Sequence, residues 1–250
     1  MATPKINGAI IYRGPSMLDG APIIVVVTGL AKSSRNAKTG DMLQTWIIRD
    51  DINPIEAAKT GLDDAICGTC FHKPSLGNTC YVNLSHAPLN IFKSSHRGIY
   101  PTITRLSDIA ALGQDRVVRL GAYGDPAAVP VGVWEALTAH ASAWTGYTHQ
   151  WRVAPQLMAL CMASADSVAE AVMAQAMGWR TFRVRTATEP VLAKEFICPA
   201  SKEAGHKTDC ASCKACMGTS AKAKASPVII AHGAKSRRFE LTRSPSKIAA

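Results

Sequence analysis

The chain has 250 residues, of which 47% are hydrophobic, so it is long enough to bury one large core. No apolar run approaches the roughly 18 residues of a membrane-spanning helix, and this excludes a membrane span. The net charge of +10 is uneven, because residues 198–250 carry ten basic and three acidic side chains. Such a basic end favours either contact with nucleic-acid phosphates or a solvated tail.

The N-terminal sequence MATPKINGAI lacks the continuous apolar region and the cleavage site of a signal peptide. We therefore expect a cytoplasmic protein. In that reducing compartment clustered cysteines are more often metal ligands than disulfides, which disfavours the alternative of two disulfide bonds.

Two apolar strands follow an irregular lead-in or short hairpin over residues 1–20. The β-branched run PIIVVVT predicts a buried strand at 22–28, and MLQTWIIR predicts a second strand at 42–49. The polar loop between them contains Lys38-Thr39-Gly40, but the residue order of a Walker-type phosphate loop is absent, so that nucleotide site is excluded. A short helix is then expected to start at Asn53-Pro54 and to stop at Gly61.

Strand-like and helix-like runs alternate along the rest of the chain. Strands are expected at 116–123, 145–151, 157–163, 180–185, 195–198 and 227–231, and helices at 106–113, 133–143 and 167–178. This succession predicts a single α/β domain over residues 1–233, with a mainly parallel sheet that forms a partial or full β/α barrel. Residues 234–250 are expected to form a basic, flexible tail.

The clearest motif is a group of four cysteines near the C-terminal end of the domain. They are Cys198, Cys210, Cys213 and Cys216, and the last three form C-x2-C-x2-C. Two residues between thiols let consecutive sulfurs turn toward one point. The spacing therefore predicts a metal site, either tetrahedral zinc or an iron–sulfur cluster.

A second group comprises Cys67, Cys70 and Cys80, in a loop rich in Gly, Pro, Ser and Asn. His72 and His86 are near enough in sequence to supply a fourth zinc ligand, and a three-thiolate site with an open position is equally compatible. The two groups can also combine in one site. The eighth cysteine, Cys161, lies between Leu160 and Met162 and is expected to be a buried core thiol.

Polar side chains follow several predicted strands, where the working groups of parallel sheets gather. These are Asp125, His149, Arg152, Asp166 and His232. Each has an ordinary structural explanation, such as a turn before Pro126 or a helix cap at Asp166, and Asp125 is the favoured functional candidate. No hydrolase elbow, H-E-x-x-H helix or G-x-G-x-x-G fingerprint is present, which argues against those enzyme classes.

The order of these landmarks resembles a bacteriophage family called after gene product eighty-eight of a mycobacteriophage. The likeness rests on the segment 36–40, a cysteine-rich loop ending Cys80-Tyr81, a strand ending Gly124-Asp125, and Cys198-Pro199 followed by C-x2-C-x2-C. That family in turn looks like the radical S-adenosylmethionine enzymes, which are partial or full β/α barrels.

The resemblance implies a role for each motif. Cys67, Cys70 and Cys80 would hold a four-iron cluster with an open iron for S-adenosylmethionine. Gly124, Asp125 and Pro126 would stand where the superfamily has Gly-Glu-Pro, which holds the methionine amino group. Four further thiols, those of Cys198, Cys210, Cys213 and Cys216, would hold an auxiliary cluster. The loop here is C-x2-C-x9-C in place of the superfamily's C-x3-C-x2-C.

Two functional hypotheses follow. The first is a cytoplasmic, phage-type iron–sulfur protein with radical-enzyme-like architecture that acts on nucleic acid or nucleotides. The second is a non-catalytic, zinc-stapled protein that binds nucleic acid through its basic C-terminal region. An aromatic content of 6% offers little stacking surface for single strands and weighs against the second hypothesis.

Overall fold

The computed structural model describes residues 6–32, 36–220 and 223–243. The strands are β1 Gly8–Pro15, β2 Pro22–Thr28, β3 Met42–Arg49, β4 Val117–Tyr123, β5 Ala143–Thr148, β6 Met162–Ala165, β7 Thr181–Arg185, β8 Glu195–Ile197 and β9 Ser226–Ile230. The α-helices are α1 Pro54–Thr60, α2 Asp64–Cys67, α3 Ala87–His96, α4 Leu106–Gly113, α5 Val131–Thr138, α6 Val168–Ala176, α7 Cys210–Cys213 and α8 Ser236–Thr242. Two 3-10 turns, η1 Pro126–Ala128 and η2 Pro155–Leu157, complete the elements.

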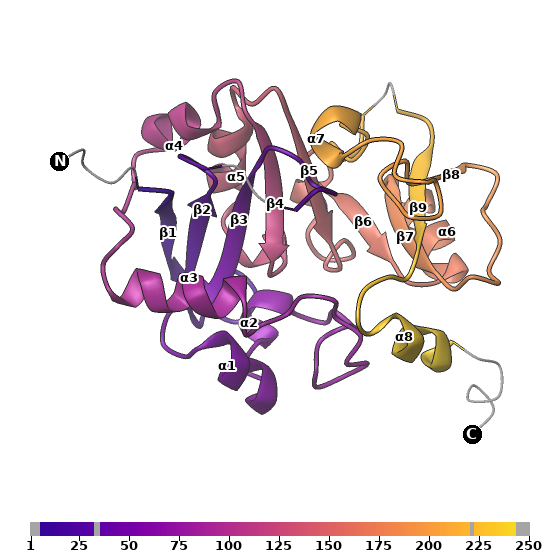
Figure 1. Ribbon diagram of the computed structural model, residues 1–250, viewed down its shortest axis with the longest axis horizontal. Coiled ribbons are helices and arrows are strands. Elements are labelled where there is room, and N and C mark those ends of the chain that lie inside the picture. Colours follow the sequence, from indigo (N-terminus) through magenta and orange to yellow (C-terminus); the bar gives the residue numbers. More distant parts are fainter. Residues whose placement is uncertain (1–5, 33–35, 221–222, 244–250) are drawn as a thin grey trace.

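All nine strands form one sheet in the order β1-β2-β3-β4-β5-β6-β7-β9-β8, as Figure 1 shows from left to right. The first three strands pair antiparallel, and every later pair is parallel. The predicted single α/β domain with a mainly parallel sheet is therefore confirmed. Within the described residues β1 and β8 are the two outer edges, so the sheet is open and is not a full barrel.

Several predicted elements have the expected bounds, including β2, β3 and α4. The lead-in is a hairpin strand, since β1 pairs with β2 from Gly8 to Pro15. The strand expected at 157–163 is shorter and later, because Pro155 starts η2 and the amides of Leu160 and Cys161 donate to the carbonyl of Leu157. The chain reaches extended structure only at Met162.

The two faces of the parallel sheet have different surroundings, because side chains alternate along each strand. In β4, Val118 and Leu120 are fully buried in the main core, which also includes Trp134 and Leu137 of α5. The alternate positions Arg119 and Gly121 line a large cavity on the opposite side of the sheet. One face of the parallel sheet thus packs into the main core, and the other face lines the cavity.

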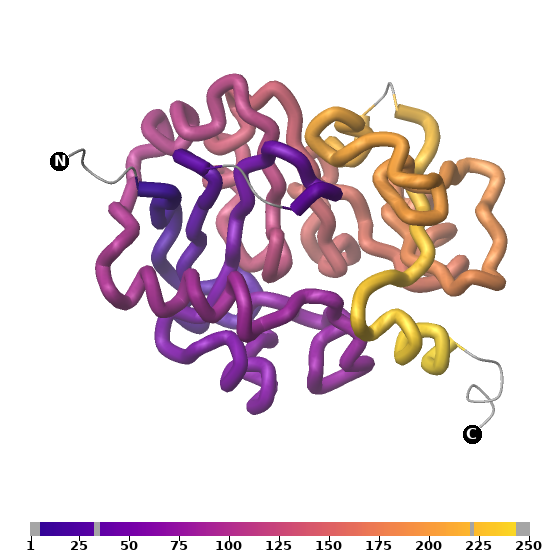
Figure 2. The backbone as a smooth tube through the Cα atoms, in the orientation of Figure 1, coloured from indigo at the N-terminus to yellow at the C-terminus, as the bar shows by residue number. Residues whose placement is uncertain are grey.

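The last described helix, α8, folds back onto the loop that carries the first cysteine group (Figure 2). Lys235 Nζ donates to Asn78 Oδ1 at 2.7 Å, Arg238 Nε donates to the Gly77 carbonyl at 3.1 Å, and Phe239 is buried. Part of the segment expected as a tail is thus a docked helix, and residues 244–250 lie outside the described residues. No helix in the described part of the chain is long and apolar enough to cross a membrane.

Candidate functional site

A cavity of about 460 Å³ lies over the exposed face of the parallel sheet. Its walls include alternate residues of the parallel strands, such as Thr145 and Tyr147 of β5 and Phe182 and Val184 of β7. The seven cysteines of the two predicted groups also line it, namely Cys67, Cys70, Cys80, Cys198, Cys210, Cys213 and Cys216. Cysteines that are up to 149 positions apart in sequence therefore face one space.

The first cysteine group is held by a loop that folds on its own backbone. Cys67 is the last residue of α2, the amide of Cys70 donates to the Cys67 carbonyl at 3.1 Å, and the amide of Cys80 donates to the His72 carbonyl at 2.8 Å. Gln150 Nε2 donates to the Cys67 carbonyl at 3.2 Å, which ties the loop to the end of β5. Gly68 is required beside this contact, because its φ is +54° and a Cβ there would lie 2.7 Å from the Gln150 amide.

Burial raises the pKa of Cys67 well above its ordinary value, and the negative charges of Cys70, Asp63 and Cys80 raise it further. Burial also raises the pKa of Cys80. These thiols are therefore protonated at neutral pH in the absence of a cation. Metal binding there must displace their protons, which makes affinity fall as the pH falls.

The second cysteine group lies on α7 and the turns beside it. Asp209 caps α7 by accepting from the Ser212 amide at 2.9 Å, and Lys214, at φ +56°, reverses the chain between Cys213 and Cys216. Burial raises the pKa of Cys216 to about 12, although a hydrogen bond with Tyr147 acts in the opposite direction. Burial raises the pKa of Cys198 as well.

The sulfurs of each group are neighbours without being closely packed. Within each group the thiols raise one another's pKa, yet among the described residues no three cysteine sulfurs lie within 4.8 Å of one another. A single zinc ion with four thiolates at 2.3 Å would bring its sulfurs to about 3.8 Å. The arrangement is therefore wider than a preformed single-ion site.

Asp125, the favoured candidate at a strand end, accepts three hydrogen bonds from nearby residues through its carboxylate. Its Oδ1 accepts from the Ala127 amide at 2.9 Å and the Thr148 hydroxyl at 2.7 Å, and its Oδ2 accepts from the His149 amide at 2.7 Å. Burial raises its pKa despite these bonds. Gly124 and Asp125 line the cavity, whereas Pro126 is buried in η1.

A polar strip crosses the cavity wall between the two cysteine groups. Arg119 donates to the Tyr81 hydroxyl at 2.6 Å, and the ring of Tyr81 lies 5.7 Å from that of His232. Lys38 Nζ is 3.0 Å from His232 Nε2, and burial, together with the Lys38 charge, lowers the pKa of His232. Within the described part of the chain neither Lys38 nor Arg119 pairs with a carboxylate, so the strip is cationic.

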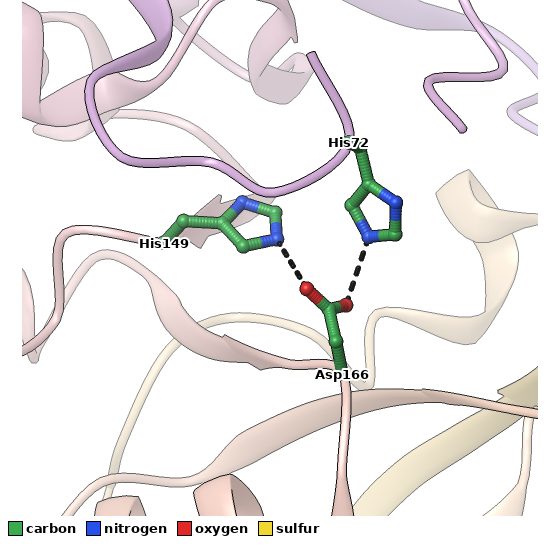
Figure 3. A group of neighbouring side chains, drawn as sticks. All are labelled: His72, His149 and Asp166. Atoms are coloured by element: carbon green, nitrogen blue, oxygen red, sulfur yellow. Dashed lines mark hydrogen bonds and ion pairs between the residues drawn. The ribbon is translucent and has the colours of Figure 1, made fainter. Parts of the chain in front are cut away.

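Three further side chains meet at the end of the cavity near Cys70. Figure 3 shows the carboxylate of Asp166 between the imidazole rings of His72 and His149. Asp166 Oδ1 is 2.8 Å from His72 Nε2, and Asp166 Oδ2 is 3.4 Å from His149 Nε2. Burial would lower the pKa of His149, but its interactions with the neighbouring Cys70 and Asp166 outweigh burial and raise that pKa well above the ordinary value.

The remaining sequence candidates lie elsewhere. Arg152 stacks over Trp151 at 3.9 Å and pairs with Glu170 at 3.3 Å, outside the cavity. Cys161 is fully buried in the main core, as its apolar neighbours indicate. The sequence placed His149 and Asp166 at separate strand ends and His72 in a cysteine loop. The adjacency of β5 and β6 was the one signal that could have shown that His149 and Asp166 lie close together.

Comparison of the chain with protein-family models, with curated proteins and with solved structures finds no match.

Proposed function

We propose that the chain is an iron–sulfur protein built on a partial β/α barrel like that of the radical S-adenosylmethionine enzymes. The observation that carries the proposal is that all seven cysteines of the two groups line one cavity on one face of a parallel sheet. Cys67, Cys70 and Cys80 would hold one cluster, and Cys198, Cys210, Cys213 and Cys216 a second. A bound cluster of this kind would supply one-electron chemistry.

The chemistry of the donors fits this assignment. Thiolates are the usual ligands of iron–sulfur clusters, and seven cysteines that can supply them stand in groups of three and four. The placement of both groups on one face of an α/β sheet favours the cluster over the alternative of a zinc-stapled protein without catalysis.

The order of the elements also supports the barrel resemblance. The loop of the first cysteine group follows β3, the first strand of the parallel run, and Gly124-Asp125-Pro126 follows β4, its neighbour. The amide of Asp125 donates to the Ile66 carbonyl at 2.6 Å, directly before Cys67, so both motifs meet at one end of the cavity. S-adenosylmethionine would bind here through backbone groups near Gly124, since the Asp125 carboxylate already accepts three hydrogen bonds.

The cationic strip suggests an anionic substrate. Lys38 and Arg119 line the cavity without a carboxylate partner in the described residues, and Lys235 of the basic C-terminal segment lies at the same cavity. Phosphate groups are the natural ligands of such side chains. We therefore propose that the protein acts on a nucleotide or on nucleic acid.

The decisive measurement is iron, sulfide and zinc content, with an absorption spectrum, on protein purified and reconstituted without oxygen. We expect brown protein with iron and sulfide in equal amounts. Replacing Cys67, Cys70 and Cys80 by serine should remove one cluster's iron, and replacing the four cysteines of the second group should remove the other. Cys161→Ala is the matched control and should retain all the iron.

A colourless protein with stoichiometric zinc would overturn the proposal and favour the zinc-stapled alternative. Iron that is lost equally from the Cys161→Ala variant would also contradict it, because that thiol lies in the core.

A further inference from the structure

The His72–His149–Asp166 group has the composition of a metal site. The three side chains come from different segments: His72 from the first cysteine loop, His149 from the residue after β5, and Asp166 from the residue after β6. One ligand atom of each lies within 4.8 Å of the other two. Two imidazoles and one carboxylate are a donor set that suits divalent first-row transition metals.

The distances can be compared with those around one bound ion. A tetrahedral ion about 2.0–2.2 Å from nitrogen and oxygen ligands holds those atoms about 3.3–3.6 Å apart. The two contacts of Asp166 with the imidazole nitrogens measure 2.8 Å and 3.4 Å. The His149 contact already has the spacing of two ligands of one ion, whereas the His72 contact would have to lengthen by about 0.5 Å as the ion replaces the direct hydrogen bond.

The surroundings orient the ligands as metal sites do. His72 Nδ1 is hydrogen-bonded to the Thr79 hydroxyl at 2.6 Å, which directs its Nε2 at Asp166. Metal-binding histidines commonly have such a partner on the second nitrogen. The Asp166 amide donates to Glu170 Oε2 at 2.8 Å, so its backbone is fixed to the start of α6.

His149 supplies an independent indication. Its Nε2 is buried and makes no hydrogen bond, since the 3.4 Å contact with Asp166 has the distance of an ion pair but not the geometry of a hydrogen bond. A buried polar atom without a hydrogen bond is costly, and a ligand that binds it removes the cost. The ring is aimed at the same carboxylate as His72 (Figure 3).

We propose that His72, His149 and Asp166 bind one divalent first-row transition-metal ion, apart from the cysteine groups. All three line the cavity, so the ion's remaining positions would be open to water or to a substrate. The site uses none of the seven cysteines and does not depend on the cluster assignment. It would place a Lewis acid beside the first cysteine group.

The probe is Co²⁺, added to the full-length protein and followed by calorimetry and visible absorption. We expect one equivalent to bind with a weak visible spectrum typical of nitrogen and oxygen ligands. This equivalent should remain when the seven cysteines of the two groups are replaced by serine, whereas any intense thiolate-to-cobalt charge transfer should disappear. Asp166→Asn should weaken binding by more than about 100-fold, since even outer-shell changes cost 10–100-fold. His140→Ala, which alters an exposed histidine, is the control and should bind as the wild type does.

A second set of variants separates this site from the clusters. Cys67→Ser, Cys70→Ser and Cys80→Ser together should keep Co²⁺ binding and lose cluster iron, whereas Asp166→Asn should keep iron and sulfide. His149→Gln serves as a second ligand variant, and circular dichroism checks that each variant is folded.

Three results would overturn the proposal: no Co²⁺ binding by the wild type, a nitrogen–oxygen cobalt spectrum unchanged in a folded Asp166→Asn protein, or loss of that spectrum when the cysteines are replaced by serine. The first of these, combined with lower thermal stability of Asp166→Asn, would identify the group as a structural brace.

Discussion

The two halves of the sheet bury different kinds of side chain. Strands β1–β5 lie in a large apolar core, and β2 alone buries five consecutive residues, from Ile23 to Val27. Around β6–β9 three arginines, Arg180, Arg183 and Arg185, are at most 8% exposed. The apolar cluster beside the second cysteine group contains only Cys198, Ala200 and Ile229 as buried members.

The arginines of the C-terminal half hold loops in place. Arg180 donates to the backbone carbonyls of Ala215, Gly218 and Ala225, so it clamps the segment that carries Cys216. Arg183 forms a fully buried pair with Glu195. Apolar burial stabilises the first half of the sheet but is non-directional, so it does not fix the positions of loops. Buried, hydrogen-bonded arginines do fix the positions of the segments they contact, at the cost of removing their charges from water. The second cysteine segment lies in the half that contains these arginines.

The largest effect is expected from breaking the buried ion pair. Glu195→Gln leaves Arg183 without its buried countercharge and should lower the free energy of unfolding by about 3–5 kcal/mol. Urea denaturation measures the loss, and hydrogen exchange should show it first in β7–β9. The double variant Arg183→Leu/Glu195→Leu should recover most of the stability, because no fully buried charge is then left unpaired and Glu189, which also pairs with Arg183, is partly exposed. A loss below 1 kcal/mol in Glu195→Gln would contradict the contrast between the halves.

A smaller effect is expected at Arg180. Arg180→Lys keeps the charge but cannot reach three carbonyls at once, and should cost about 1.5–3 kcal/mol. If the second cysteine group holds a cluster, the variant should also lose iron from it faster on exposure to a chelator. Arg152→Lys, on the exposed surface, is the matched control and should change neither quantity.

The smallest effect concerns Cys161 in the apolar core. Burial raises its pKa well above the ordinary value, so as the pH rises the unfolded chain loses this proton before the folded chain does. The resulting loss of stability begins near the unfolded pKa of about 8.5 and amounts to at most about 1.4 kcal/mol per pH unit. Cys161→Ala should show a correspondingly shallower decline between pH 8.5 and 10 in thermal unfolding. An equal decline of stability with pH in the wild type and in Cys161→Ala would mean that burial does not raise the pKa of this thiol.

The same contrast explains what the sequence could predict. β2 and β3 were predicted with their observed bounds, because continuous apolar runs ended by polar residues are an unambiguous strand signal. Helix α3 was not predicted, since Ala87–His96 follows a cysteine loop and begins after His86, which is not one of the usual N-cap residues. The strand at β7 was predicted, but alternating charges are typical of a half-exposed strand, and only tertiary pairing buries its two arginines.

The candidate site was predictable in its parts and not in its assembly. Cysteine spacing identified both groups, and strand ends identified Asp125, His149 and Asp166. The convergence of His72 with His149 and Asp166 depends on how a loop after β3 crosses to the ends of β5 and β6. Such contacts depend on packing between distant segments, for which local sequence carries no signal.

A segment near the start of the described chain contacts the second cysteine group, and a segment near its end contacts the first. The carbonyls of Lys38 and Thr39 accept from the amides of Cys210 and Ala211, while Lys235 and Arg238 bind the loop before Cys80. A ribosome delivers residues in order, so neither group can be fully enclosed until almost all of the chain has emerged. Enclosure of the first cysteine group is therefore a late step of folding, completed only when α8 docks.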